Sequence, residues 1–290
     1  MRIQRILLSL GMIAFVGAVA AGATGAFFSD TETSIGNTFA AGDIDLQIDN
    51  ESYAIDYNIP GFANPTGVLA LSTTTSWLQQ NLGQGCLTNA STSPCFFFHF
   101  VDLKPGDFGE DTISVHVGSN NAWACLALDL TATPENTLVD PEVDAGDIGP
   151  ALGNNGELQN YLHFTFWHDD GDNVFEDGEQ VISSLNNVLA STLQGQWHAL
   201  ADASNTPALV GGSTNFIAKT WCFGTTTPNA VAPGNGPPTQ RGTGFICDGS
   251  GPNNDAQTDS IVMDVAFQAI QSRNNGKFLC SSLPPLNQQN

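Results

Sequence analysis

The sequence predicts an all-β protein, a jelly-roll-like sandwich of two antiparallel sheets with long loop insertions. Several segments are rich in β-branched and aromatic residues or alternate between apolar and polar residues. Clusters of Gly, Pro, Asn and Ser separate these segments, and helical periodicity is scarce. Packing two sheets together buries the apolar faces of such strands, so we expect a sandwich.

The alternation is strictest at 43–49, where Ile44, Leu46 and Ile48 are expected to share one face of a strand. The segment 112–117 repeats this pattern with its own apolar residues at every second position. In chain order, the predicted strands are 43–49, 112–117, 124–132, 161–168, 216–223 and 260–270.

Residues 43–290 are expected to form one sandwich domain. Weak helical periodicity occurs at 71–82 and 180–193, and both segments are expected to be insertions rather than core. Loop insertions are predicted at about 50–95 and 200–258.

The cysteines favour disulfide bonds. All six lie beyond the first 26 residues, and an even number in an exported chain is typical of a disulfide framework. Cys86 and Cys95 flank a short polar loop, which makes them the most plausible pair. The segment 225–257 is dominated by Pro, Gly, Asn and Thr, so we expect a long loop that Cys247 pins in its middle. No CxxC occurs, which argues against zinc.

Residues 1–26 have the features of an export signal. Arg2 and Arg5 precede an apolar run at 6–21, and small residues follow up to Ala26, where we expect cleavage. The run has about 16 residues, whereas a membrane helix needs roughly 20. We therefore expect a secreted or cell-surface protein without a membrane span after cleavage.

The chain is strongly acidic, with 7 Lys and Arg residues against 29 Asp and Glu residues and a net charge of −22. Such a surface repels nucleic acid and anionic membranes. Divalent cations or cationic partners are its natural complements, although halophilic adaptation is another source of acidity.

The segment 168–179, HDDGDNVFEDGE, fits a calcium loop in which oxygen ligands recur at fixed positions. Asn173 stands where such a loop needs a positive φ. His168 occupies the first ligand position, so Asp169 is the candidate to replace it. The alternative is a solvated acidic turn without a metal. The predicted ligands of a structural Ca²⁺ are Asp169, Asp170, Asp172, Val174 through its carbonyl, Glu176 and Glu179.

No catalytic motif is present. The sequence lacks HExxH, G-x-S-x-G and a P-loop, so we expect a protein that is not an enzyme. An adhesion module that binds glycans is an alternative, and its first candidate residues would be exposed Trp77, Trp123 or Trp197.

Three segments resemble the TasA/camelysin family of exported proteins. The segment 22–48, GATGAFFSDTETSIGNTFAAGDIDLQI, is similar to the family's cleavage region, its T-F-x-x-G sequence and its D-L strand. The turn at 103–107, LKPGD, is similar to the family's L-x-P-G-D turn, and the acidic loop 168–179 is similar to an aspartate-rich loop. The family-like residues of the first two segments are Ala26, Phe27, Phe28, Ser29, Asp30, Thr38, Phe39, Gly42, Asp45, Leu46, Leu103, Pro105, Gly106 and Asp107.

The resemblance implies a jelly-roll sandwich, processing by a dedicated SipW-like signal peptidase and self-association into biofilm-matrix fibres. In such fibres the N-terminal segment of one subunit, here 27–42, adds as a strand to the next subunit. The alternative for 27–42 is pairing within its own sheet. Camelysin was classed as a metallopeptidase, so a secreted metallopeptidase is an alternative function, although no zinc-ligand motif occurs here.

Overall fold

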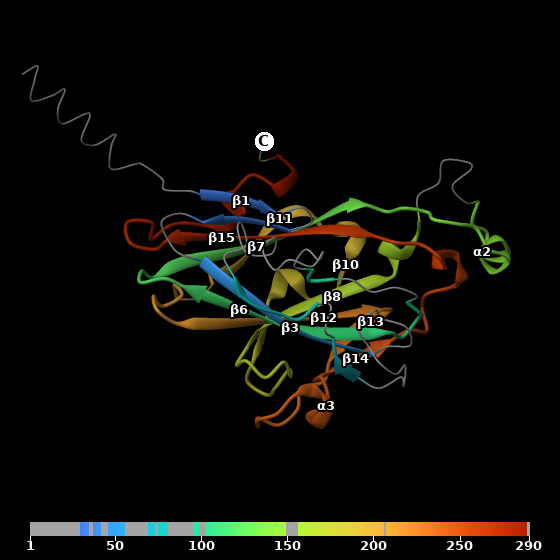
Figure 1. Ribbon diagram of the computed structural model, residues 1–290, viewed down its shortest axis with the longest axis horizontal. Helices are drawn as coiled ribbons and strands as arrows, with labels where there is room; N and C mark the ends of the chain where they lie inside the picture. Colours follow the sequence, from blue (N-terminus) through green and yellow to red (C-terminus); the bar gives the residue numbers. More distant parts are fainter. Residues whose placement is uncertain are drawn as a thin grey trace, which may run out of the picture.

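A computed structural model describes much of the chain, and the ribbon is shown in Figure 1. The signal segment 1–26, Ile44 and the predicted Cys86–Cys95 bond lie outside the described residues. The described residues are 30–34, 37–41, 46–55, 69–72, 75–80, 96–98, 103–148, 156–205 and 207–288.

The first sheet, sheet A, has the strand order β1-β2-β15-β7-β11 and forms the upper layer in Figure 1. Its neighbouring strands are antiparallel, except that β2 runs parallel to β15. The strands are β1 (Asp30–Ser34), β2 (Asn37–Ala41), β15 (Val262–Gln271), β7 (Ala122–Ala132) and β11 (Gln194–Ala201).

The second sheet, sheet B, has the order β10-β8-β12-β6-β3-β4, and β5 and β9 pair with β3 and β8. All of its pairings are antiparallel. Its strands are β3 (Leu46–Ile55), β4 (Leu69–Leu71), β5 (Trp77–Gln80), β6 (Phe108–Val117), β8 (Leu162–Asp169), β9 (Gln180–Val181), β10 (Val188–Leu189) and β12 (Thr214–Phe223).

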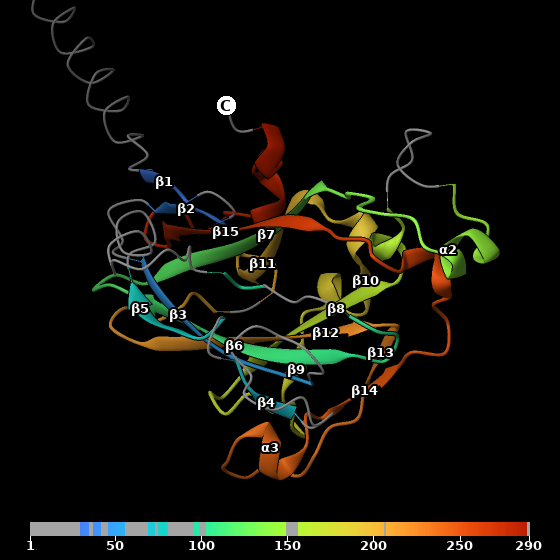
Figure 2. The ribbon, with the colours of Figure 1, turned by 45° about the vertical axis from the view of Figure 1, so that its right-hand side comes forward.

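The remaining elements are short. A hairpin pairs β13 (Thr225–Pro228) with β14 (Phe245–Asp248). Helix α2 (Asp140–Ala145) lies at one end of the sandwich, and α3 (Pro238–Arg241) lies beyond the outer face of sheet B (Figure 2). The 3₁₀ turns are Leu158–Asn160, Ser183–Leu185, Ala190–Thr192, Asn254–Ala256, Cys280–Ser282 and Leu286–Gln288.

The two sheets face each other across one apolar core, which confirms the predicted all-β sandwich. Ile113, Val115 and Val117 of β6 all point into this core, as the alternation of their segment predicts. Leu46 and Ile48 of β3 do the same. Each of the six predicted strand segments overlaps an observed strand, and the ends differ by a few residues.

The expectation of helical insertions is wrong for the described residues. Trp77–Gln80 forms strand β5, which pairs with β3. The segment 180–193 contains short strands and 3₁₀ turns. This irregular backbone turns Ile182, Leu185 and Leu193 toward the core, where all three are buried. Tertiary packing therefore overrides the weak helical periodicity of both segments.

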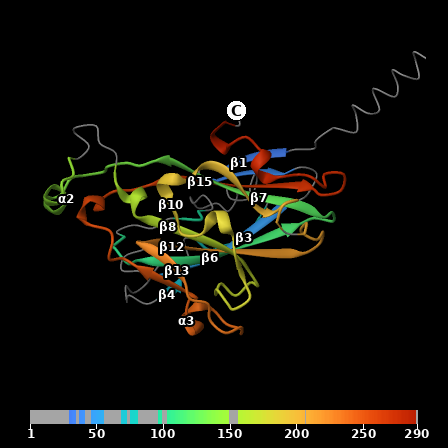
Figure 3. The same ribbon diagram turned by 180° about the vertical axis from the view of Figure 1, so that it is seen from behind.

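Each sheet carries a covering segment that a disulfide bond attaches to its outer face. The C-terminal segment packs over sheet A, where Cys280 is bonded to Cys125 of β7. The hairpin β13–β14 packs beside sheet B, where Cys247 is bonded to Cys222 of β12. The prediction that Cys247 pins the Pro- and Gly-rich segment 225–257 is thus confirmed. The expectation that this segment is a long loop is wrong, because it contains β13, α3 and β14. Figure 3 shows both covering segments from behind.

Candidate metal centre

The acidic loop 170–179 leaves the end of β8 and lies on the outer face of sheet B. Phe164 and Phe166 of β8 point into the core, so Trp167 and Asp169, at odd positions, point outward. Thr112 of β6 lies on the same outer face and donates a hydrogen bond to Asp169. Because successive side chains of β8 point to opposite faces of the sheet, Asp169 is the carboxylate of this strand that lies on the side of the acidic loop.

Asp169 organises the turn that follows it. Its Oδ2 accepts hydrogen bonds from Thr112 Oγ1 at 3.0 Å, from the Gly171 N–H at 3.1 Å and from the Asn173 N–H at 3.2 Å. Its Oδ1 accepts from Trp167 Nε1 at 3.2 Å. Asn173 has φ of 63°, which is the conformation expected from its place in the calcium pattern.

Three of the six predicted ligands come together. Carboxylate oxygens of Asp169, Asp170 and Glu179 lie within 4.8 Å of one another. Calcium binds oxygens at 2.3–2.6 Å, so oxygens on opposite sides of one ion lie about 5 Å apart. These three carboxylates are therefore close enough to hold one metal ion, and the cluster contains Asp169 rather than His168.

The oxygens of Glu179 are also held by the backbone of the loop. Its Oε1 accepts from the Asp170 N–H at 3.0 Å, and its Oε2 accepts from the Glu176 N–H at 2.9 Å. These bonds close the loop and hold the last predicted ligand beside the first two.

Asp172 and Glu176 face a different partner. Both carboxylates form ion pairs with the guanidinium of Arg241, the last residue of α3. Glu176 Oε1 also accepts from the Gly234 N–H at 2.9 Å, and Asp172 Oδ1 accepts from the Val174 N–H at 3.1 Å. Val174 itself is fully buried. The structure thus divides the predicted ligands between a carboxylate cluster and an arginine.

The electrostatics of the cluster favour a positive ligand. Burial is the main cause that raises the pKa of Asp169 to about 6 and the pKa of Glu179 to about 7. Hydrogen bonds from Asn173 and from Thr112 oppose this rise at Asp169. A bound dication would favour the ionised forms of both groups.

Sequence reasoning missed Glu110 and Arg241. Glu110 of β6 is fully buried under the loop, and burial followed by the charges of Asp169 and Asp172 raises its pKa well above the ordinary value. The alternation of β6 could have indicated Glu110, because it places Glu110 on the same outer face of the strand as Thr112. Nothing local indicates Arg241, which lies in the Pro- and Gly-rich segment.

The loop rests on aromatic side chains and on a second loop. The rings of Phe175 and Trp167 lie 5.9 Å apart, and Phe245 of β14 is 4.9 Å from each. The backbone of Phe175 accepts from the Val231 N–H and donates to Thr243 O. The acidic loop is therefore fixed by the segment 229–245.

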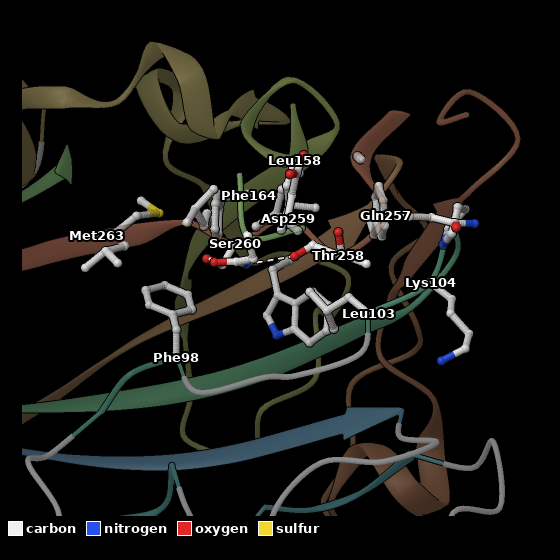
Figure 4. A pocket seen from close by; sticks show the side chains of 18 of the residues that line it. Phe98, Leu103, Lys104, Leu158, Phe164, Gln257, Thr258, Asp259, Ser260 and Met263 are labelled. Carbon is white, nitrogen blue, oxygen red and sulfur yellow. Dashed lines mark hydrogen bonds between the residues drawn. The ribbon is translucent and has the colours of Figure 1, made fainter. Parts of the chain in front are cut away.

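An apolar cavity of about 730 Å³ lies apart from the acidic loop, between the two sheets. In Figure 4, Phe98 and Leu103 lie on one side of it, and Phe164 and Leu158 lie on the other. Asp259 and Thr258 belong to its wall near Leu158.

The tryptophans proposed for glycan binding serve the fold. Trp197 is buried, and its indole N–H donates to Pro284 O at 2.9 Å. Trp77 and Trp123 are half-buried, and they donate to Phe96 O and Asn275 O. The indole N–H groups are thus already satisfied within the chain.

The fold and the site define an all-β, disulfide-bonded protein with acidic clusters. Where the structure describes the chain, the groups close enough to share a metal ion consist of carboxylates. Its disulfides fit an oxidising compartment. None of the described helices has the length and apolar character of a membrane span. No protein-family model matches the chain, and no curated protein was found to be similar to it.

Proposed function

We propose that this chain is an exported structural protein of the cell surface or extracellular matrix, and that its copies assemble into fibres by N-terminal strand addition. A calcium ion in the acidic loop stabilises each subunit. The resemblance to the TasA/camelysin family supports this proposal, and so does the place of the N-terminal segment in sheet A.

The observation that carries the proposal is the pairing of β2 with β15. The two strands are parallel, and their register joins Asn37 to Val265 and Ala41 to Ala269. Among the described strands, β1 alone lies beyond β2, so the β1–β2 hairpin forms the edge of the sheet as described. If 30–41 left this position, the backbone of β15 would become an open edge, which the same segment of another copy can complete.

A cysteine pair across this register tests where the strand comes from. Ala40 is the register partner of Gln268 in the β2–β15 pair, so Ala40→Cys with Gln268→Cys puts cysteines at paired backbone positions. In assembled material, we expect a ladder of covalently linked chains on a non-reducing gel. Monomers alone, or the absence of fibres in electron micrographs at any concentration, would contradict strand exchange.

A matched control uses a cysteine pair between β15 and β7, two strands of the sandwich that are not proposed to pass from one copy to another. Val262 of β15 lies opposite Ala132 of β7, and both are exposed. The pair Ala132→Cys with Val262→Cys should give only monomers under the same oxidising conditions. A ladder from this control would show that the linkage arises from collisions between chains.

The calcium site is tested by thermal melting in calcium and in chelator. Calcium that binds only the folded state stabilises by RT ln(1 + [L]/Kd), which is about 1.4 kcal/mol at ten times Kd. We expect this stabilisation to disappear in Asp170→Ala and Glu179→Ala. Equal melting temperatures of the unmodified protein in both solutions would remove the metal from the proposal.

A further inference from the structure

A second carboxylate cluster lies near helix α2 and shares no residue with the acidic loop. Carboxylate oxygens of Glu135, Asp147 and Glu157 lie within 4.8 Å of one another, and so do those of Glu135, Glu142 and Asp259. Glu135 belongs to both groups and is therefore the centre of the cluster. We name these five residues the α2 carboxylate cluster.

Glu135 is an unpartnered buried carboxylate aimed into this cluster. Its exposed fraction is 8%, neither of its oxygens accepts a hydrogen bond from a described N–H or hydroxyl donor, and the groups that face it are the carboxyl groups of Asp259 and Asp147. Burial, followed by the charges of Asp259 and Asp147, raises its pKa to about 8. An isolated buried carboxylate is costly unless a cation or a proton compensates it.

The other members are held in place around Glu135. Glu142 of α2 is fully buried, and it accepts from the Val139 N–H at 2.6 Å and from Thr258 Oγ1 at 3.1 Å. Asp259 accepts from the Glu157 N–H at 2.5 Å. Three separate segments of the chain therefore present carboxylates to one point.

The backbone leaves room for this approach at one glycine. A Cβ at Gly156 would lie 2.6 Å from Cγ of Asp259, so a larger residue would push this carboxylate away from its neighbours. The absence of a side chain at Gly156 thus lets Asp259 lie close to the other carboxylates. Carboxylates at such short distances repel one another unless a counter-ion lies between them.

We infer that the α2 carboxylate cluster is a second site for a hard divalent cation, with calcium as the fitting ion. Carboxylate oxygens are the ligands that calcium prefers, and it accepts six to eight of them. The ion would join the end of β7, helix α2 and the start of β15. This site is independent of the acidic loop.

Calcium binding to the full chain, measured by titration calorimetry, tests the inference. We expect two ions per unmodified chain and one ion for Glu135→Gln. Glu179→Gln, which alters only the acidic loop, should also bind one ion, and the remaining ion should disappear when both substitutions are combined. Two ions bound by Glu135→Gln would overturn the second site, whereas loss of the ion only in Glu135→Gln would leave it as the sole site.

A matched control and a second measurement separate binding from misfolding. Asp144 is an exposed carboxylate on helix α2. Asp144→Asn therefore replaces a carboxylate by an amide, as Glu135→Gln does, but should leave the number of bound calcium ions unchanged. In chelator at about pH 9, above the pKa of Glu135, Glu135→Gln should melt at a higher temperature than the unmodified protein because a buried charge is removed. A lower melting temperature in chelator would contradict the repulsion on which the inference depends.

A different observation concerns Lys219 and Asp111, which lie opposite each other on β12 and β6. Both side chains point between the sheets, on the same strand faces as Ile217 and Ile113, and their exposed fractions are 1% and 0%. They form an ion pair. Lys219 Nζ also donates to Phe97 O at 3.3 Å and lies 4.1 Å from the ring centre of Phe98.

An ion pair in such an apolar place is costly, and an amide would remove both charges. Burial lowers the pKa of Lys219 well below its ordinary value, which favours the nucleophilic neutral amine. We propose that Lys219 and Asp111 condense to an intramolecular isopeptide bond. The ammonium first gives a proton to the carboxylate; the amine nitrogen then bonds to Cγ of Asp111, and the Cγ–OH bond breaks. The leaving hydroxyl takes a proton from the nitrogen, so one amide and one water form.

Mass spectrometry of the reduced, unfolded full chain tests the bond. We expect a mass that is lower by one water, a branched peptide that joins the segments containing Lys219 and Asp111, and no such peptide from Lys219→Met with Asp111→Leu. The full mass of the linear chain would overturn the proposal. A missing water located at any other residue would overturn it as well.

Discussion

Arg241 donates to the carboxylate of Asp172 across 69 residues of sequence, and it also pairs with Glu176. The acidic loop contains no Lys or Arg of its own and receives an arginine from the Pro- and Gly-rich segment. Arg241 neutralises two of the predicted calcium ligands, and the other carboxylates of the loop are left for a metal ion.

The substitution Arg241→Gln should change stability and calcium binding in opposite directions. In chelator, Asp172 and Glu176 lose their counter-ion, so the melting temperature should fall. In calcium, the same two carboxylates become free to bind the ion, so the rise in melting temperature caused by calcium should be larger than in the unmodified protein. Melting in chelator and at several calcium concentrations measures both effects. An equal loss of melting temperature in all solutions would show that Arg241 does not compete with calcium.

Gly244 is predicted to be required for the contact between the acidic loop and its covering segment. Its φ is +74°, and a Cβ at this position would collide with the carbonyl oxygen of Phe175. Gly242 has φ of +83° but no atom within 4 Å of such a Cβ. With a ψ of 169°, Gly242 lies in a backbone region that is essentially restricted to glycine, so Gly242→Ala should cost about 1 to 3 kcal/mol from the backbone alone.

Gly244→Ala should cost more than Gly242→Ala, because a collision with the backbone of Phe175 adds to the strain of its positive φ. Denaturant unfolding of both variants measures the difference. Equal losses of unfolding free energy would mean that the covering segment moves away from Phe175 without cost.

The two disulfide bonds should differ in their contribution to stability. Cys125 and Cys280 are 155 residues apart in sequence, whereas Cys222 and Cys247 are 25 residues apart. In the chain-entropy model the longer loop constrains the unfolded state more, by about 1.5 kcal/mol. Removing the first bond with paired Cys→Ala substitutions should therefore lower the unfolding free energy more than removing the second. The reverse order, in non-reducing denaturant unfolding, would contradict the model for this protein.

Asp202 should make the protein sensitive to acid. Burial acts to raise its pKa, but hydrogen bonds from Ser204 and from the Cys280 N–H outweigh burial and hold the pKa below its ordinary value of 3.8. Because the folded pKa is the lower one, the ionised group stabilises the fold above about pH 4. This stabilisation is lost as the pH falls through the folded pKa.

The variant Asp202→Asn should accordingly melt at a lower temperature than the unmodified protein at pH 7. The difference between the two proteins should narrow as the pH falls from about 4 through the folded pKa of Asp202, because below that pKa the carboxylate is protonated in both states of the unmodified protein. Thermal melting between pH 2 and pH 7 measures this trend. A difference that does not change with pH would show that the charge of Asp202 does not matter.

The sequence by itself determined the strands of the core and the turn of the acidic loop. Ile113, Val115 and Val117 are buried because a strand turns every second side chain to the same face, and this period is visible in the sequence. Asn173 adopts its positive φ because a local hydrogen bond from its N–H to Asp169 closes the turn. Both features depend on residues that are close together in the chain.

Only the tertiary structure decided which charges meet. Arg241 reaches Asp172 because the Cys222–Cys247 bond and the β13–β14 hairpin fold the Pro- and Gly-rich segment under sheet B. Asp259 reaches Glu135 because β15 pairs with β7. Charge interactions act between residues that are close in space at any separation in the chain, so no local pattern of residue types reveals them.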